Sequence, residues 1–470
     1  MSRLRGVVII LWRRPTDNLA TSCNHIDQPS MDPSGSRIAN DSGNVNGQSR
    51  TALATCVILA ALCMAAILFV RSPGENRLRS LCMDRKVVVS QLHVFVNCDS
   101  REFIALAQNP ARILSYADTI RQSRPAFAAL GWVAALPFRA GEHFLKNTSD
   151  RGFFQRGLAP FYFGFILINA VILLTASRIF LSLTAGGRQD LFAVILPLTA
   201  FILNGVTIWF FWTPHLQMFN LLIPVLAIQQ AKRVSGLSGK KLIINCLVAG
   251  LLCGFGGLAY GAFLLVPAGI AARLLFNLRT QRTRELMTAI VSLAVAFALP
   301  LLVWRALVIG SSGRFYMAET EHYHQFVWVV ESLRKGGEPF LTAALTNTTH
   351  FLSTLGTVVL WPFLAFVLTR FIRSARHVEA RMNRELAISI VAYYAVAVPF
   401  LWLMGFYAYR LTWLLVPPIL ILLAGELAAL LDNANVSSRL TAKILVAIAV
   451  VLYGALMLAT DQSVYAMARV

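Results

Sequence analysis

Arginine side chains accumulate in the polar stretch 71–124, where basic residues outnumber acidic ones. A guanidinium group binds a phosphate through paired N–H···O hydrogen bonds, so these arginines could hold a phosphate group at a membrane surface. The other interpretation is that the arginines reach anionic lipid headgroups and bind no substrate. The charge pattern alone leaves both interpretations equally open.

One of the acidic residues in this stretch, Asp99, stands just before an amphipathic pattern. Apolar Phe103, Leu106 and Ala107 follow it at helical spacing. The pattern predicts a short helix lying on the membrane, with Asp99 at or near its N-cap. A purely structural interpretation, in which Asp99 does no more than cap this helix, stays open beside a chemical one.

A second polar stretch, 309–352, contains the run Glu319-Thr-Glu321-His-Tyr-His324. Carboxylate and imidazole groups at this spacing can bind a metal ion. In so polar a stretch such groups are more often solvated, so we favour a solvated cluster over a zinc site. Apolar residues across 326–333 predict another amphipathic helix resting on the membrane.

The composition indicates the elements that must position these residues. Hydrophobic residues make up 57% of the chain, charged residues only 14%, and the mean hydropathy is +0.64. A soluble chain carries roughly a quarter charged residues, so the deficit indicates a lipid-facing surface. The net charge of +20 lies mainly in short loops between apolar runs, which is typical of a membrane protein and not of a nucleic-acid-binding one.

Apolar runs of span length recur from Thr51 to Thr460. They predict an all-α polytopic membrane protein with about 11–12 transmembrane helices. Residues 1–50, rich in Ser, Asn, Asp, Gly and Arg, predict a disordered cytoplasmic tail before the transmembrane domain 51–470. The expected spans are 51–70, 160–184, 190–212, 216–230, 242–258, 260–276, 287–308, 353–372, 386–404, 411–431 and 444–460.

Three basic clusters, each two spans from the next, predict the orientation. Basic loops stay in the cytoplasm, so 71–124 and 309–352 are expected to face outward. The apolar segment Pro125–Phe138 is short for a span, and a full crossing there would put Lys232 on the wrong side. We therefore expect a short or re-entrant element somewhere within 125–230. The clusters are Lys232, Arg233, Lys240 and Lys241; Arg279, Arg282 and Arg284; and Arg370, Arg373, Arg376, Arg381 and Arg384.

Three pieces of sequence follow Asp99 in an order that resembles a known family. They are Arg121-Gln-Ser-Arg124-Pro125, Trp209-Phe-Phe-Trp-Thr-Pro-His215 and Phe406-Tyr-Ala-Tyr-Arg410-Leu-Thr-Trp-Leu-Leu-Val-Pro-Pro418. With the single span and the large outer loop before them, they resemble the layout of the GT-C superfamily of integral membrane glycosyltransferases. The resemblance is spread over roughly 51–431.

The resemblance implies transfer of a sugar from a polyprenyl-phosphate carrier to an envelope glycan, lipid or protein acceptor on the outer face of the membrane. It implies that Asp99 is the catalytic base of a single inverting displacement, since an acceptor hydroxyl needs a carboxylate to take its proton. Arg121, Arg124 and Arg410 would stabilise the departing lipid phosphate. No Asp-x-Asp or Asp-x-Glu motif includes Asp99, so we favour a site without cofactor or metal over one with a divalent metal.

Three further residues are candidate contacts to substrate. Glu102 is the nearest second acid to Asp99, His215 stands at the outer end of a span, and His324 belongs to the second outer stretch. His215 and Arg410 also fit an interfacial role in a belt of aromatic residues, where they would bind no substrate.

Cys82 and Cys98 both belong to the first outer stretch and could form a disulfide outside the cytoplasm. This, with the expected outer loops, favours a multi-pass protein of the plasma (inner) membrane whose active site faces outward. Its partners would be the lipid-linked sugar donor, the acceptor and membrane lipids, and no nucleic acid.

The competing functional class is a multispan transporter or flippase of envelope precursors. Few charges lie at mid-membrane, where coupling ions usually need them, and no internal repeat is evident. Glycines crowd 250–261, which permits close helix packing and motion. Glu426 in an apolar run must be paired or lie near the cytoplasmic end, and we favour the latter. A third class is a non-catalytic assembly partner.

Overall fold

The structure is a computed structural model, and its described residues lie in the compact unit Arg50–Val470. The predicted tail 1–50 and half of the predicted span 51–70 lie outside the described residues. These are 54, 57–65, 83–89, 92–115, 121–140, 157–184, 191–276, 283–321, 323–378, 383–433 and 436–459.

The protein is an all-α polytopic membrane protein with one two-stranded hairpin in its described part. Seven helical segments of the described residues are long and apolar enough to cross a membrane, and each coincides with a predicted span. They are α8 (Ala159–Thr184), α9 (Leu191–Ile202) with α10 (Gly205–Phe210), α12 (Gly239–Gly257), α14 (Thr283–Ser312), α19 (Arg384–Met404), α20 (Tyr409–Thr412) with α21 (Val416–Asp432), and α22 (Val436–Ala459).

An eighth candidate span is bent. Helices α17 (Gly337–Val358) and α18 (Leu360–Ala375) pass the same test only as a pair, and their axes differ by 62°. The predicted outer stretch 309–352 is therefore too long, because α14 continues to Ser312 and α17 begins at Gly337. The hydroxyl and amide groups of polar residues in α17 find partners within the helix, because they donate to carbonyls four residues earlier, for example Thr348 to Ala344 at 2.7 Å.

Two predicted spans become shorter helices that begin after a break. The first is η1 (Leu216–Met218) with α11 (Phe219–Val234), and the second is η2 (Gly261–Leu264) with α13 (Leu265–Phe276). Both α11 and α13 are buried along most of their length, so other helices cover them instead of lipid. Their broken starts bring irregular backbone to one end of the bundle.

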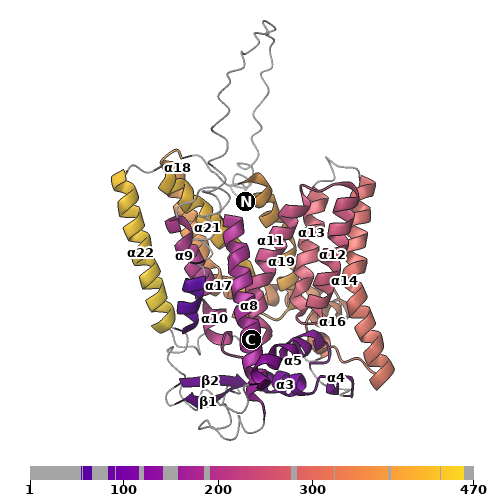
Figure 1. Cartoon of the computed structure of the whole chain (residues 1–470). Coiled ribbons are helices and arrows are strands. Elements are labelled where there is room, and N and C mark those ends of the chain that lie inside the picture. Colours follow the sequence, from indigo (N-terminus) through magenta and orange to yellow (C-terminus); the bar gives the residue numbers. More distant parts are fainter. Residues whose placement is uncertain are drawn as a thin grey trace, which may run out of the picture. The chain divides into compact units, whose positions relative to one another are not determined.

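The short apolar helix α5 (Pro125–Ala140) has both ends at the same end of the bundle. At its start, the Ala126 N–H donates to the Leu258 carbonyl beyond the end of α12 at 3.2 Å. At its finish, the Arg139 guanidinium lies 5.4 Å from the Phe161 ring at the start of α8. Figure 1 shows the start of α8 and α5 at the end that also carries β1 and β2. Helix α5 is thus the short element that the sequence predicts.

We call this end, where α12 and α14 finish and α8 begins, the Asp99 end. The opposite end, where α11 and α13 finish and α12 and α14 begin, is called the basic end. There the Glu285 carboxylate accepts from the Gly239 N–H, and Arg273 pairs with Glu385. Basic residues on each side of these helix ends make this the end that the sequence predicts to be cytoplasmic.

Glu426 is buried at the basic end and pairs with Arg373. The sequence offered two explanations for Glu426, an ion pair or a position near the basic end. Both apply, since the carboxylate lies near that end and is also paired. The ion pair joins α18 to α21, and Arg373 also donates to the Val378 carbonyl at 2.6 Å.

The Asp99 end carries a small layer outside the spans. Strands β1 (Met83–Val89) and β2 (Leu92–Asn97) pair antiparallel, and α3 (Cys98–Gln108) and α4 (Arg112–Ser115) follow them. The predicted helix after Asp99 is present, but its expected position on the lipid surface is wrong. Phe103 is buried in the protein, 4.8 Å between ring centroids from Phe127 of α5, so α5 and α8 cover its apolar face.

Candidate functional site

Asp99 lies in the first turn of α3, and a different residue caps that helix. Asn97 is the N-cap, and its side chain accepts from the Ser100 N–H at 2.7 Å. This leaves the Asp99 carboxylate available for two partners from distant segments. One oxygen is 3.1 Å from Nε2 of His215, and the other pairs with Arg121. The interpretation that Asp99 only caps a helix is therefore wrong.

His215 lies in the break between α10 and η1, with its side chain buried. Its Nδ1 accepts from the Gln217 N–H at 3.4 Å, so the proton of the neutral ring belongs on Nε2 and is donated to Asp99. Burial lowers the pKa of His215 to about 4, although the Asp99 carboxylate opposes this. His215 is thus a neutral donor that orients the carboxylate.

Arg121 is fully buried beneath Asp99 and holds two carboxylates. Its second ion pair is with Glu102, at 3.0 Å from Nε, and its guanidinium carbon lies 4.7 Å from the Phe103 ring centre. Burial raises the pKa of Asp99, but the hydrogen bond from His215 and the charges of Arg121 and Arg410 hold it below the usual range. Asp99 is therefore ionised at neutral pH.

Arg124 lies immediately before α5 and reaches across to the segment between α14 and α16 (Val327–Lys335). Its guanidinium is 3.3 Å from the carboxylate of Glu319 on α15 (Ala318–Glu321). Its own backbone N–H donates to the Arg121 carbonyl at 2.9 Å, which fixes the two arginines in one tight turn.

Arg410 lies in α20, where the chain begins its return through the bundle. Its backbone carbonyl accepts from the Asn220 side chain at 2.7 Å. Its buried Nε has no hydrogen-bond partner within the part of the chain that the structure describes, and no carboxylate there forms an ion pair with it. An arginine held this way offers donors for an anionic ligand.

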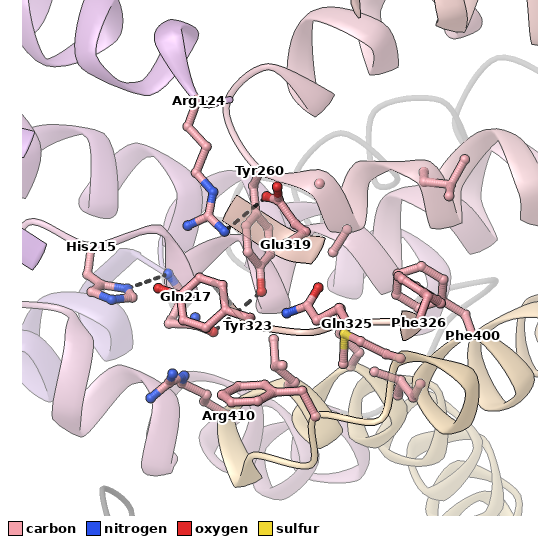
Figure 2. Close-up of a pocket in the computed structure, with 18 of the residues that line it drawn as sticks. Arg124, His215, Gln217, Tyr260, Glu319, Tyr323, Gln325, Phe326, Phe400 and Arg410 are labelled. Carbon is pink, nitrogen blue, oxygen red and sulfur yellow. Dashed lines mark hydrogen bonds and ion pairs between the residues drawn. The ribbon is translucent and has the colours of Figure 1, made fainter. Parts of the chain in front are cut away.

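A cavity of about 210 Å³ lies among these residues at the Asp99 end. Its lining divides into a polar and an apolar part, as Figure 2 shows for His215 and Arg410 on one side and Phe326 and Phe400 on the other. The polar lining residues are Asp99, Arg124, His215, Gln217, Tyr260, Glu319, Tyr323, Gln325 and Arg410. The apolar ones include Ala262, Leu264, Phe326, Phe400, Leu401, Met404, Phe406, Leu411 and Leu414.

Most of the residues singled out in the sequence come together here. Asp99, Arg124, His215 and Arg410 line the cavity. Arg121 does not line it but positions Asp99 from behind, and Glu102 reaches the site only through Arg121. His324 is exposed, outside the lining, and in the left-handed backbone region with φ of 49°, so the structure does not bring it to the site.

Several polar lining residues were not anticipated. The Asn220 side chain donates to Gln217 at 2.7 Å, and the Tyr260 hydroxyl donates to Asn220 at 2.9 Å. This chain connects the starts of α11 and α13 under the cavity. Gln217 and Asn220 lie within an apolar run, and a buried amide needs a hydrogen-bond partner. These two residues could therefore have predicted the chain.

The two carboxylates in the run from Glu319 to His324 pair with arginines. No group of three or more His, Cys, Asp or Glu side chains able to hold a metal occurs among the residues that the structure describes. Glu319 instead faces Arg124, and Glu321 pairs with Arg314 at 2.5 Å. Cys98 is disulfide-bonded, while its predicted partner Cys82 lies outside the described residues.

The cavity combines guanidinium groups, an ionised carboxylate and an apolar wall, an arrangement that could hold an amphipathic anion. Comparison of the chain with protein-family models, with curated proteins and with solved structures finds no match.

Proposed function

We propose that this protein is a membrane glycosyltransferase that moves a sugar from a polyprenyl-phosphate carrier to an envelope glycan, lipid or protein. The observation that supports it most is the cavity, which places the ionised Asp99 and the unmatched Arg410 beside an apolar wall. A lipid phosphate has one charged part and one long apolar part, and this lining suits both.

The proposed step is a single displacement at the anomeric carbon. The acceptor hydroxyl oxygen bonds to that carbon, its proton passes to Asp99, and the bond from carbon to phosphate oxygen breaks with its electron pair on the phosphate. Arg410 and Arg124 stabilise the negative charge on the departing phosphate. The sugar inverts, and the products are the glycosylated acceptor and polyprenyl phosphate.

The low pKa of Asp99 fits this order of events. In the empty cavity the positive charges of Arg121 and Arg410 help to lower the pKa of that carboxyl. A bound phosphate would neutralise part of this charge, so the pKa of Asp99 should rise when donor binds. The carboxylate would therefore become a stronger base once a donor is present.

An outward orientation accords with this function. Cys98, next to Asp99, is disulfide-bonded, and disulfides persist mainly in oxidising compartments. The basic clusters gather at the other end of the bundle, where the positive-inside rule puts the cytoplasm. A lipid-linked donor can reach such a site from within the membrane.

The test is transfer by the Asp99→Asn variant in lipid nanodiscs, with a panel of radiolabelled polyprenyl-phosphate-linked hexoses and pentoses. We expect the wild type to transfer at least one of them, and the variant to lose about 10²-fold or more in turnover, because the acceptor proton has no base. Donor binding should change little. The control is Glu331→Gln on the exposed side of α16, which should keep wild-type turnover.

Retained turnover in Asp99→Asn would remove this residue from the mechanism. A transporter or flippase would behave differently, moving labelled lipid between leaflets with modest loss in the variant and without forming any glycosylated product.

A further inference from the structure

The charged side chains that line the described part of the cavity are matched except for one. Asp99 is held by Arg121 and by the neutral ring of His215. Glu319 and Arg124 pair with each other at 3.3 Å. Arg410 forms no ion pair with a carboxylate among these residues, so its guanidinium is open to an anionic ligand.

We propose that Glu319 determines how many negative charges the cavity accepts on a lipid headgroup, an inference that rests on the lipid-phosphate site proposed above. While Glu319 occupies Arg124, a headgroup with one negative charge is matched by Arg410. A headgroup with two must displace Glu319 or leave one charge unmatched, and an unmatched charge in a partly desolvated site is costly. Glu319 therefore acts as a specificity-determining residue.

Glu319 is suited to this role because its backbone is held in place. It belongs to the segment 313–326, which we call the strap and of which His322 lies outside the described residues. The Gln325 N–H donates to the Glu319 carbonyl at 2.7 Å, and the Tyr316 N–H donates to the Gln122 side chain at 2.8 Å. The carboxylate thus faces Arg124 as part of a fixed turn.

The other partner is fixed as well and retains a free donor. Arg124 is held in the turn before α5, and its buried Nε has no hydrogen-bond partner within the described residues. The side chains of Arg124 and Glu319 are 12% and 26% exposed, so water screens their attraction only partly. Removing the Glu319 charge should expose a second guanidinium to the ligand.

The test is a binding measurement with two sugar-free probes, farnesyl methyl phosphate with one negative charge and farnesyl methyl diphosphate with two. Each is titrated calorimetrically into the full-length protein in nanodiscs of uncharged lipid. We expect the wild type to bind the singly charged probe more tightly. In Glu319→Gln the doubly charged probe should gain about tenfold in affinity, as expected for a new charge-assisted pair, and the singly charged probe much less.

Two controls separate local pairing from a general change in charge. Glu321→Gln removes an acid two residues away that pairs with Arg314 outside the cavity, and it should keep the wild-type preference. Glu319→Asp retains the carboxylate and should keep it too. An equal change of preference in Glu321→Gln would overturn the role of Glu319.

A reciprocal variant keeps the proposal testable if Glu319→Gln does not fold. Arg124→Gln leaves the Glu319 carboxylate facing the ligand without its partner, so it should weaken the doubly charged probe more than the singly charged one. Equal weakening would contradict the proposal. If the wild type binds neither probe, the lipid-phosphate site itself is wrong, whereas binding with an unchanged preference in Glu319→Gln removes only the role of Glu319.

Discussion

His215 shows how one buried side chain can determine the state of its neighbour. The ring is neutral, since Nδ1 accepts from Gln217, and it donates its proton to Asp99. A protonated ring in the unfolded chain must lose its proton to fold into this position. The free energy of unfolding should therefore decrease as the pH falls and His215 becomes protonated in the unfolded chain.

Burial lowers the pKa of His215 from 6.5 to about 4, so in that range the unfolded chain binds a proton that the folded chain does not. Stability should fall as the pH drops from about 6.5 to about 4, by up to about 3 kcal/mol. The pKa of Asp99 is also lowered, so the loss should continue as the pH drops below 4. The measurement is the melting temperature of the detergent-solubilised protein against pH.

The variant His215→Gln can still donate to Asp99 but does not titrate. It should show a flatter profile between these two pH values, while the control His324→Gln, at an exposed position, should follow the wild type. A wild-type melting temperature that is constant across this range would contradict the assignment of a buried neutral ring.

At the scale of elements, α12 and α14 approach so closely that side chains are excluded between them. A Cβ atom on Gly254 would lie 2.5 Å from the Phe297 carbonyl oxygen and 3.0 Å from Pro300. Small residues at such crossings let helix backbones pack directly, which is a main source of helix association in membranes.

We expect Gly254→Ala to destabilise the protein by about 1–3 kcal/mol, because the helices must separate to admit the methyl group. Gly425→Ala on α21 is the control, since its Cβ would meet no atom within 4 Å and alanine favours helix. The measurement is the melting temperature of both variants in the same detergent. An equal change in melting temperature for the two would show that a methyl group fits at the crossing of α12 and α14.

At the scale of the whole molecule, the two ends of the bundle differ in charge and in architecture. The described residues at the basic end belong to helix ends and to short turns such as 235–238, whereas the Asp99 end carries the hairpin, α3, α4, α5 and α16 (Figure 1). Such asymmetry implies that each end meets a different compartment.

A membrane-impermeant maleimide applied to intact cells should label Glu331→Cys at the Asp99 end and leave Lys240→Cys at the basic end unlabelled, because the reagent does not cross the bilayer. Both positions are exposed, and the free cysteines of the described residues, Cys63, Cys246 and Cys253, are buried. The reverse pattern would place Asp99 in the cytoplasm and would remove the basis for a lipid-linked donor.

Much of this arrangement could be predicted from the sequence, because hydropathy and charge act over single segments. Apolar runs located the spans. A full crossing by 125–138 would have put Lys232 on the non-cytoplasmic side, which indicated a short element, and that element is α5. The helix after Asp99 was also predicted, but not its burial. The apolar pattern around Phe103 is compatible with contact to lipid or to protein, and only the tertiary packing determines which of them covers the side chain.

The sequence identified only those site residues whose side-chain chemistry suited the expected reaction and whose positions matched the expected order of segments. Asp99 and the three arginines were identified from the charge of the first outer stretch and from the order of the segments that resemble the GT-C layout. Glu319 was noted only as a possible metal ligand, since its contact to Arg124 joins residues 195 positions apart. No local pattern encodes such a pair, and the same is true of the hydrogen-bond chain through Tyr260.

Trp328 attaches one edge of the cavity to α19. Its indole N–H donates to the Leu403 carbonyl at 2.8 Å, and its ring fills the space that a side chain at Gly405 would need. The neighbouring Phe326 N–H donates to the Met404 carbonyl at 3.1 Å. One edge of the cavity is therefore fastened to the last turn of α19. The Tyr316 N–H holds the strap to Gln122 near its other end, so any opening of the cavity along this edge must break contacts at α19 or at Gln122.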